Sequence, residues 1–202
     1  MSRPTPIQFW FSIGSTYTYL TVARLPQIQL ASALSFEWRP FSVRAIMVEQ
    51  NNIPFRNKPI KAAYMWRDIE RRCGKYGLAA NLPAPYPLKE FDLANRVAVV
   101  GLREGWCAKY VQGAYRRWFV DSLEAGSEPN LSQSIAEAGQ DAKRVIAAAN
   151  SEAIVTAYDT ATDEARRLGI FGAPTFIVDG EVFWGDDRLD DAIAWRLNGK
   201  LG

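Results

Sequence analysis

Histidine is absent from this chain of 202 residues. The absence excludes Ser-His-Asp and Cys-His catalytic groups, HExxH zinc sites and the two-histidine iron triad, because each of them needs an imidazole ring. Proton transfer by this protein therefore depends on lysine, tyrosine, carboxylate groups or a group that a bound molecule supplies. We expect no metal site.

Cysteine is scarce. The chain contains only Cys73 and Cys107, which lie far apart and form no CxxC pair. Both are flanked by helix-like sequence, so we expect half-buried thiols. A dithiol redox centre is therefore excluded.

Long apolar runs and basic clusters are also missing. No segment approaches the ~20 apolar residues that a membrane span needs. The net charge is +2 and no basic run exceeds two residues, which argues against a nucleic-acid partner. The first residues, MSRPTPIQFWF, lack the apolar core of a secretory signal, so we expect a cytoplasmic protein.

The N-terminal part of the chain reads as β-α-β. Residues 7–12 form a short aromatic run typical of a buried strand, and apolar residues recur at helical spacing over residues 16–33. Pro26 should kink this helix or end its first half. Apolar and polar residues then alternate from Leu34 to Arg39, as in a strand with one buried face. This order predicts a parallel pair of strands with a right-handed crossover.

The C-terminal part predicts α-β-β-α. A helix over residues 151–168 ends at Gly169, and strands at residues 175–178 and 181–184 flank an Asp179-Gly180 hairpin turn. Asp186 or Asp187 is positioned to N-cap a last helix that ends near Gly199.

The pattern between these two parts is helical throughout. Helices are predicted at residues 58–76, 91–104, 108–125, 131–138 and 141–149. The element order predicts an α/β fold, a thioredoxin-like domain with an inserted all-helical domain. Residues 1–41 and 165–202 would form the first domain, and residues 42–164 the second.

Four stretches, in order along the chain, resemble one family: FWFSIGSTYTYL, NKPIKAAYMWRDIERRCGKYG, FGAPTF and FWGDDRL. The chain resembles the 2-hydroxychromene-2-carboxylate isomerases and the related kappa-class glutathione transferases. These are thioredoxin-like proteins with a helical insertion, related to disulfide oxidoreductases. The resemblance implies a glutathione-dependent isomerase of aromatic hydrocarbon catabolism, a small-molecule substrate and a cytoplasmic homodimer.

The hydroxyl groups near the start of the first helix have two interpretations. Taken alone, Ser15 is an ordinary N-cap serine, and Thr16 and Thr18 are equal candidates for that role. The resemblance implies instead that Ser15 replaces the attacking cysteine of the redox relatives and is the catalytic residue. Because a serine with no base nearby is a poor nucleophile, Ser15 would donate a hydrogen bond to the thiolate of glutathione.

The resemblance also implies the residues that bind glutathione. Pro174 would be cis and face the turn, so that the backbone of Ala173 pairs with the cysteinyl unit. Asp187 is the first choice for the γ-glutamyl group, with backbone contributions from Gly185 and Asp186, although both aspartates can equally cap the helix.

Two further residues match an Asn and a Lys of the family. Asn52, with Asn51 as a rival, and Lys61 would lie near glutathione or the substrate carboxylate. Tyr64 and Asn95 are candidates for the substrate cleft.

The sequence departs from the family at Thr16, where a proline is usual, and at Ile13-Gly14. A missing proline loosens the turn and fits a subgroup with a different substrate. Two alternatives therefore stay open: a kappa-class-like transferase that conjugates electrophiles, and a thioredoxin-like protein that binds glutathione without turnover.

Overall fold

A mixed four-stranded sheet lies at the centre of the computed structural model, which describes residues 5–32, 34–55 and 57–201. The strand order is β2-β1-β3-β4. Strand β1 (Ile7–Phe11) pairs in parallel with β2 (Phe36–Pro40) and antiparallel with β3 (Thr175–Val178), which pairs antiparallel with β4 (Glu181–Trp184). The predicted α/β thioredoxin-like fold is confirmed, including the parallel first pair.

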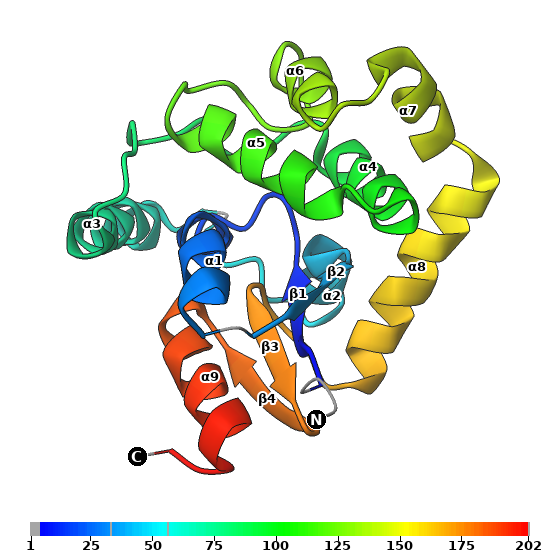
Figure 1. The fold of residues 1–202 in the computed structure, drawn as a ribbon. Coiled ribbons are helices and arrows are strands. Elements are labelled where there is room, and N and C mark those ends of the chain that lie inside the picture. The colour runs from blue at the N-terminus through cyan, green and yellow to red at the C-terminus, as the bar shows by residue number, and fades with distance from the viewer. Residues whose placement is uncertain (1–4, 33, 56, 202) are drawn as a thin grey trace.

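The helices surround this sheet. In Figure 1, α8 and α9 lie on opposite sides of it, and α4 to α7 lie above the end at which β1 meets the following loop. The bounds are α1 (Thr18–Ser32), α2 (Val43–Glu49), α3 (Pro59–Tyr76), α4 (Phe91–Glu104), α5 (Cys107–Phe119), α6 (Asn130–Glu137), α7 (Ala142–Ala149), α8 (Glu152–Arg167), the short 3₁₀ segment η1 (Asp186–Arg188) and α9 (Leu189–Asn198). Residues 1–4 of the predicted first domain and residue 33 of the predicted first helix lie outside the described residues.

Local turn signals place the C-terminal hairpin. Asp179 and Gly180 both have positive φ, 51° and 88°, as a two-residue hairpin turn requires. Strands β3 and β4 therefore have the predicted bounds. Gly169 has a φ of 74° just after α8, which confirms the predicted helix stop.

Three expectations about helix ends are wrong. Pro26 does not end the first half of α1, because Leu25 and Ile28 on either side of the exposed proline pack against the same core and the helix continues to Ser32; the predicted kink stays a prediction. Neither Asp186 nor Asp187 caps the last helix, since no side chain caps η1 or α9 and the Asp186 carboxylate turns inward. The predicted helix 108–125 also ends early, at Phe119.

One hydrophobic core joins the sheet to the helices above it. Phe9 stacks on Phe11 and Phe176 within the sheet, while Trp118 and Tyr115 are fully buried in the helical part. Helix α5 packs on α1, and α4 packs on β2. Within the described ranges, no helix has both the length and the apolar character needed to cross a membrane.

Candidate active site

Ser15 lies in the loop between β1 and α1 and points across the molecule. Its side chain is half-buried, and its hydroxyl donates a 2.7 Å hydrogen bond to the carbonyl oxygen of Ala173, which is 158 residues away in the chain. The Ala173-Pro174 peptide bond is cis. The expectation that a cis proline loop faces this turn is therefore confirmed.

The hydroxyl groups of the turn do not cap α1. Ser15 is committed to Ala173, Thr16 donates to the sulfur of Met65 at 3.0 Å, and the buried Thr18 hydroxyl oxygen accepts no backbone N–H. The N-cap interpretation is therefore wrong for all three residues.

The start of α1 instead offers free donors. Within the described part of the chain, the backbone N–H groups of Thr16, Tyr17 and Thr18 donate no hydrogen bond. The positive end of the helix dipole lies at the same point. An anion placed beside the Ser15 hydroxyl would therefore meet both a hydroxyl donor and unpaired backbone donors.

Helices α4 and α5 hold this turn from behind. Asn95 accepts a 2.7 Å hydrogen bond from the N–H of Ile13 and donates to the carbonyl oxygens of Ile13 and Phe91 at 2.9 and 2.8 Å. The Tyr115 hydroxyl lies 3.0 Å from the carbonyl oxygens of both Ser12 and Ser15. Both side chains are fully buried, so their hydrogen bonds fix the backbone that carries Ser15.

The prediction that Asn95 lines the substrate cleft is therefore wrong. The side chain has no exposed surface, and its amide is occupied by backbone groups. Tyr115 was not predicted at all. In the sequence, Tyr115 cannot be distinguished from any other tyrosine on the buried face of an amphipathic helix. Only the fold shows that its hydroxyl contacts the carbonyl groups of Ser12 and Ser15.

Gly14 explains part of the departure from the family pattern. Its φ is +126°, and a Cβ at this position would lie 2.4 Å from the ring of Phe91. The backbone thus passes closely over an aromatic ring of α4, which only glycine permits. Phe91 and Asn95, one helical turn apart, together set the path of the turn.

The Gly185-Asp186-Asp187 segment reaches the same region. The N–H of Gly185 donates to the carbonyl of Pro174 at 2.9 Å, so this segment and the proline loop are joined directly. Asp186 is 2% exposed and accepts hydrogen bonds of 2.9 Å from both Thr21 and Arg24. Asp187 stays exposed beside Arg188. Of the two carboxylates, only Asp187 is accessible to a ligand.

The remaining predicted residues are exposed. Asn52 precedes α3, and Lys61 and Tyr64 lie one turn apart on it. Within the described residues, their side chains make no hydrogen bond or ion pair, although the Lys61 amine lies 5.9 Å from the ring centre of Phe55. Their roles stay predictions. Asn51, the rival of Asn52, is also exposed.

The two cysteines are inert in this environment. Burial, with a smaller contribution from the charge of Asp186, raises the pKa of Cys73 to about 11. Burial also raises the pKa of Cys107 far above its usual value. Neither thiol would ionise near neutral pH, so neither is a candidate for a reactive thiolate.

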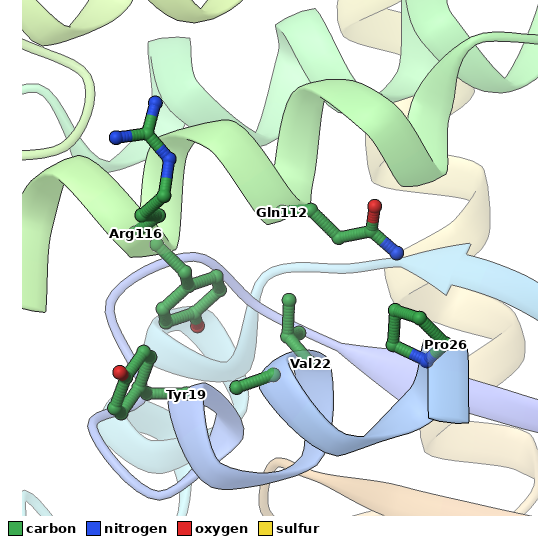
Figure 2. A pocket seen from close by; sticks show the side chains of 7 residues that line it. Tyr19, Val22, Pro26, Gln112 and Arg116 are labelled. Carbon is green, nitrogen blue, oxygen red and sulfur yellow. The ribbon is translucent and has the colours of Figure 1, made fainter. Parts of the chain in front are cut away.

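Two hollows open among the helices, and the first shares Tyr115 with the support of the turn. One, of about 230 Å³, opens between α1 and α5; its lining includes Tyr19, Val22, Gln112, Tyr115 and Arg116 (Figure 2). The other, of about 430 Å³, lies among α2, α4 and α8. None of the predicted site residues lines either hollow.

Comparisons with known proteins find similarity to thioredoxin-like proteins, among them proteins named as isomerases. A family model described as a DSBA-like thioredoxin domain matches residues 6–193. The 2-hydroxychromene-2-carboxylate isomerase of Sphingobium xenophagum is 27% identical over 95% of this chain and 98% of the relative. A solved structure of a 2-hydroxychromene-2-carboxylate isomerase superimposes with a TM-score of 0.84 at 23% identity, covering 96% of both chains. A putative protein disulfide isomerase from Nitrosomonas europaea superimposes with a TM-score of 0.72 at 14% identity, covering 98% of this chain and 97% of the other.

Proposed function

The chain belongs to the family of DSBA-like thioredoxin domains, and within this family we propose that it is a glutathione-dependent isomerase of 2-hydroxychromene-2-carboxylate or a closely related aromatic catabolic intermediate. The relatives that carry the isomerase name support the reaction. The observation that carries the proposal is Ser15, whose hydroxyl donates to Ala173 beside the proline loop. The redox relatives of the resembled family place their attacking cysteine at this point.

The residues around Ser15 fit glutathione. Within the described residues, the backbone N–H of Ala173 donates no hydrogen bond, so it is available to pair with the cysteinyl unit of a peptide. The N–H groups of Asp186 and Asp187 are likewise free to hold a carboxylate, and the exposed Asp187 side chain suits an ammonium group. Lys61 and Asn52 suit a second carboxylate, from glutathione or from the substrate.

Bound glutathione would supply the thiolate that adds reversibly to the conjugated substrate and leaves once the freed carbon–carbon bond has rotated. Ser15 would transfer its hydrogen bond from the Ala173 carbonyl to the sulfur, and the N–H groups at the start of α1 would add their dipoles. No side chain acts as a general base in this scheme, which suits a chain without histidine. Positioning and stabilisation of the anion provide the catalysis.

The test is an absorbance assay with 2-hydroxychromene-2-carboxylate, run with and without glutathione. We expect interconversion only with glutathione and no net consumption of the thiol. The absence of any glutathione-dependent interconversion would overturn the proposal. Stoichiometric loss of glutathione would indicate a kappa-class-like transferase, and calorimetric binding of glutathione without activity on a panel of electrophiles would indicate a binding protein.

The resemblance also supports a homodimer in the cytoplasm. Light scattering of the purified protein tests the first point, and fractionation of the native host tests the second.

A further inference from the structure

Three aromatic side chains form a wall beside the reactive turn. The ring centre of Tyr86 lies 6.1 Å from that of Phe55 and 6.1 Å from that of Trp66, both edge to face. Tyr86 is 38% exposed, and the other two are half-buried. Helix α3 meets the turn next to these rings, because Met65, the residue before Trp66, accepts the hydrogen bond of Thr16. The three rings offer a flat conjugated molecule apolar surface to pack against.

Arg44, on α2, contacts Leu88 and Phe91, which follow Tyr86 in the chain. Its guanidinium group sits 4.1 Å over the ring centre of Phe91, and one N–H donates to the carbonyl of Leu88 at 3.2 Å. Phe91 is the ring that Gly14 passes over, so only one aromatic ring separates Arg44 from the turn. The charge of Arg44 also lowers the pKa of the Tyr86 phenol against the larger, raising effect of burial. Arg44 therefore lies within electrostatic reach of the wall.

The guanidinium group of Arg44 has N–H donors that are not used within the described part of the chain. Its side chain is exposed, and within the described residues no carboxylate lies within 4.0 Å of it. A guanidinium group has five N–H donors in a planar fork that matches a carboxylate, and the carbonyl of Leu88 uses one of them. Lys61, a second described cation, lies near Phe55.

Among the described residues, Lys61 lies near Phe55 and Arg44 lies over Phe91, and the proposed reaction brings two carboxylate-bearing molecules to this region. We propose that Arg44 binds the carboxylate of the aromatic substrate while Phe55, Trp66 and Tyr86 hold its ring, which leaves Lys61 for glutathione. The substrate class is a flat, conjugated aromatic acid. The inference rests on the proposed function for the identity of the second ligand, and it assigns specificity to a residue that the sequence did not single out.

The test measures binding without glutathione and without turnover. Chromone-2-carboxylate, a stable analogue, and chromone, which lacks the carboxylate, are titrated against tryptophan fluorescence, since Trp66 lies in the wall. We expect Arg44→Gln to weaken chromone-2-carboxylate binding about 10- to 100-fold, the range for a lost hydrogen-bonded charge pair. Binding of chromone should not change. Arg44→Lys should retain part of the affinity.

Lys61→Gln is the matched control. It removes the positive charge of Lys61. We expect it to weaken glutathione binding and to leave chromone-2-carboxylate binding intact. Equal losses for chromone and its carboxylate in Arg44→Gln would mean that Arg44 only braces Phe91, and unchanged affinity for the carboxylate would also overturn the inference. Circular dichroism melts check that each variant is folded.

The outcome separates the two proposals. If the protein binds the carboxylate through Arg44 but does not isomerise 2-hydroxychromene-2-carboxylate, the proposed function fails alone. If it isomerises that substrate and Arg44→Gln keeps the same KM, the subsite fails alone.

Discussion

At the scale of single residues, Ser15 is a hydrogen-bond donor without a base. Its hydroxyl meets a backbone carbonyl, and no described side chain accepts its proton. An unactivated serine is a weak nucleophile at neutral pH. The side chain therefore suits the stabilisation of an anion better than attack on a substrate.

Replacing Ser15 with alanine tests this role. Loss of a hydrogen bond to a charged group costs about 1.5–3 kcal/mol, so the pKa of bound glutathione should rise by at least about one unit. The rate of isomerisation should fall about 10- to 100-fold. Titration of the ultraviolet thiolate absorbance reads the pKa directly.

Thr18→Val is the control for this experiment. Within the described residues, the buried Thr18 hydroxyl meets no partner at hydrogen-bond geometry, so its removal leaves no new unpaired group and should leave both readouts unchanged. The same thiolate pKa in Ser15→Ala and the wild type would refute the role of Ser15.

Gly14 carries the second prediction at this scale. Gly14→Ala would place a methyl group 2.4 Å from the Phe91 ring at a φ of +126°, and we expect a loss of about 2 kcal/mol or more in unfolding free energy. Urea denaturation measures this loss. Gly74→Ala, exposed in the last turn of α3 with open space around it, should instead stabilise the protein by up to about 1 kcal/mol. Similar effects of the two changes would contradict the steric argument.

At the scale of elements, local signals in the sequence predicted well. The turn at Asp179-Gly180 and the stop at Gly169 depend on backbone conformations that neighbouring residues decide. The bounds of β3, β4 and α4 followed from such signals. Features that neighbouring residues determine can therefore be predicted from the sequence alone.

Features decided by distant partners could not be predicted. Asp186 looked like a helix cap, but Arg24, 162 residues away, draws its carboxylate inward. Asn95 looked like a cleft residue, but Ile13, 82 residues away, occupies its amide. In both cases the polar side chain forms a hydrogen bond with a distant buried group, because a buried polar group without a partner costs much free energy.

The support of the turn by α4 and α5 gives a third prediction. Asn95→Leu leaves the N–H and C=O of Ile13 buried without partners, so we expect a loss of about 2–3 kcal/mol in unfolding free energy. Tyr115→Phe removes one hydroxyl and should cost about 1 kcal/mol. Denaturant titrations measure both losses.

If Tyr115 positions the turn, its replacement should change the kinetics as well as the stability of the protein. In folded Tyr115→Phe, kcat should fall and the pKa of bound glutathione should rise, while KM for glutathione changes little. Tyr110→Phe, a second buried tyrosine of α5 whose hydroxyl bonds the carbonyl of Ala94 at 3.2 Å, is the matched control. Equal kinetics of the two variants would argue against positioning by Tyr115.

At the scale of the whole molecule, both cysteines lie inside the continuous core. Because burial raises the pKa of Cys73 to about 11, the neutral thiol persists well above neutral pH. A group whose pKa is higher in the folded than in the unfolded protein makes its full contribution to folding stability at pH values below the unfolded pKa. That contribution is lost as the pH rises from about 9 through about 11.

We therefore expect no labelling of the native protein by a thiol reagent near neutral pH, and reaction of both cysteines in urea. Colorimetric thiol titration measures this. Cys73→Ala should keep glutathione-dependent activity and flatten the loss of stability at alkaline pH. Inactivation on replacement of Cys73 would show that the protein uses a thiol of its own.

The pairing of β1 with β3 has a consequence for biosynthesis. The strand that carries Phe9 and the turn with Ser15 leave the ribosome well before their partners Phe176 and Ala173, because Ala173 follows Ser15 by 158 residues. Until then the nascent chain exposes one edge of β1, and folding has to wait for these long-range pairs. The helices that precede β3 in the chain are complete by that time and can shield the aromatic strand. The candidate site around Ser15 is thus assembled only after the scaffold that holds its turn has been synthesised.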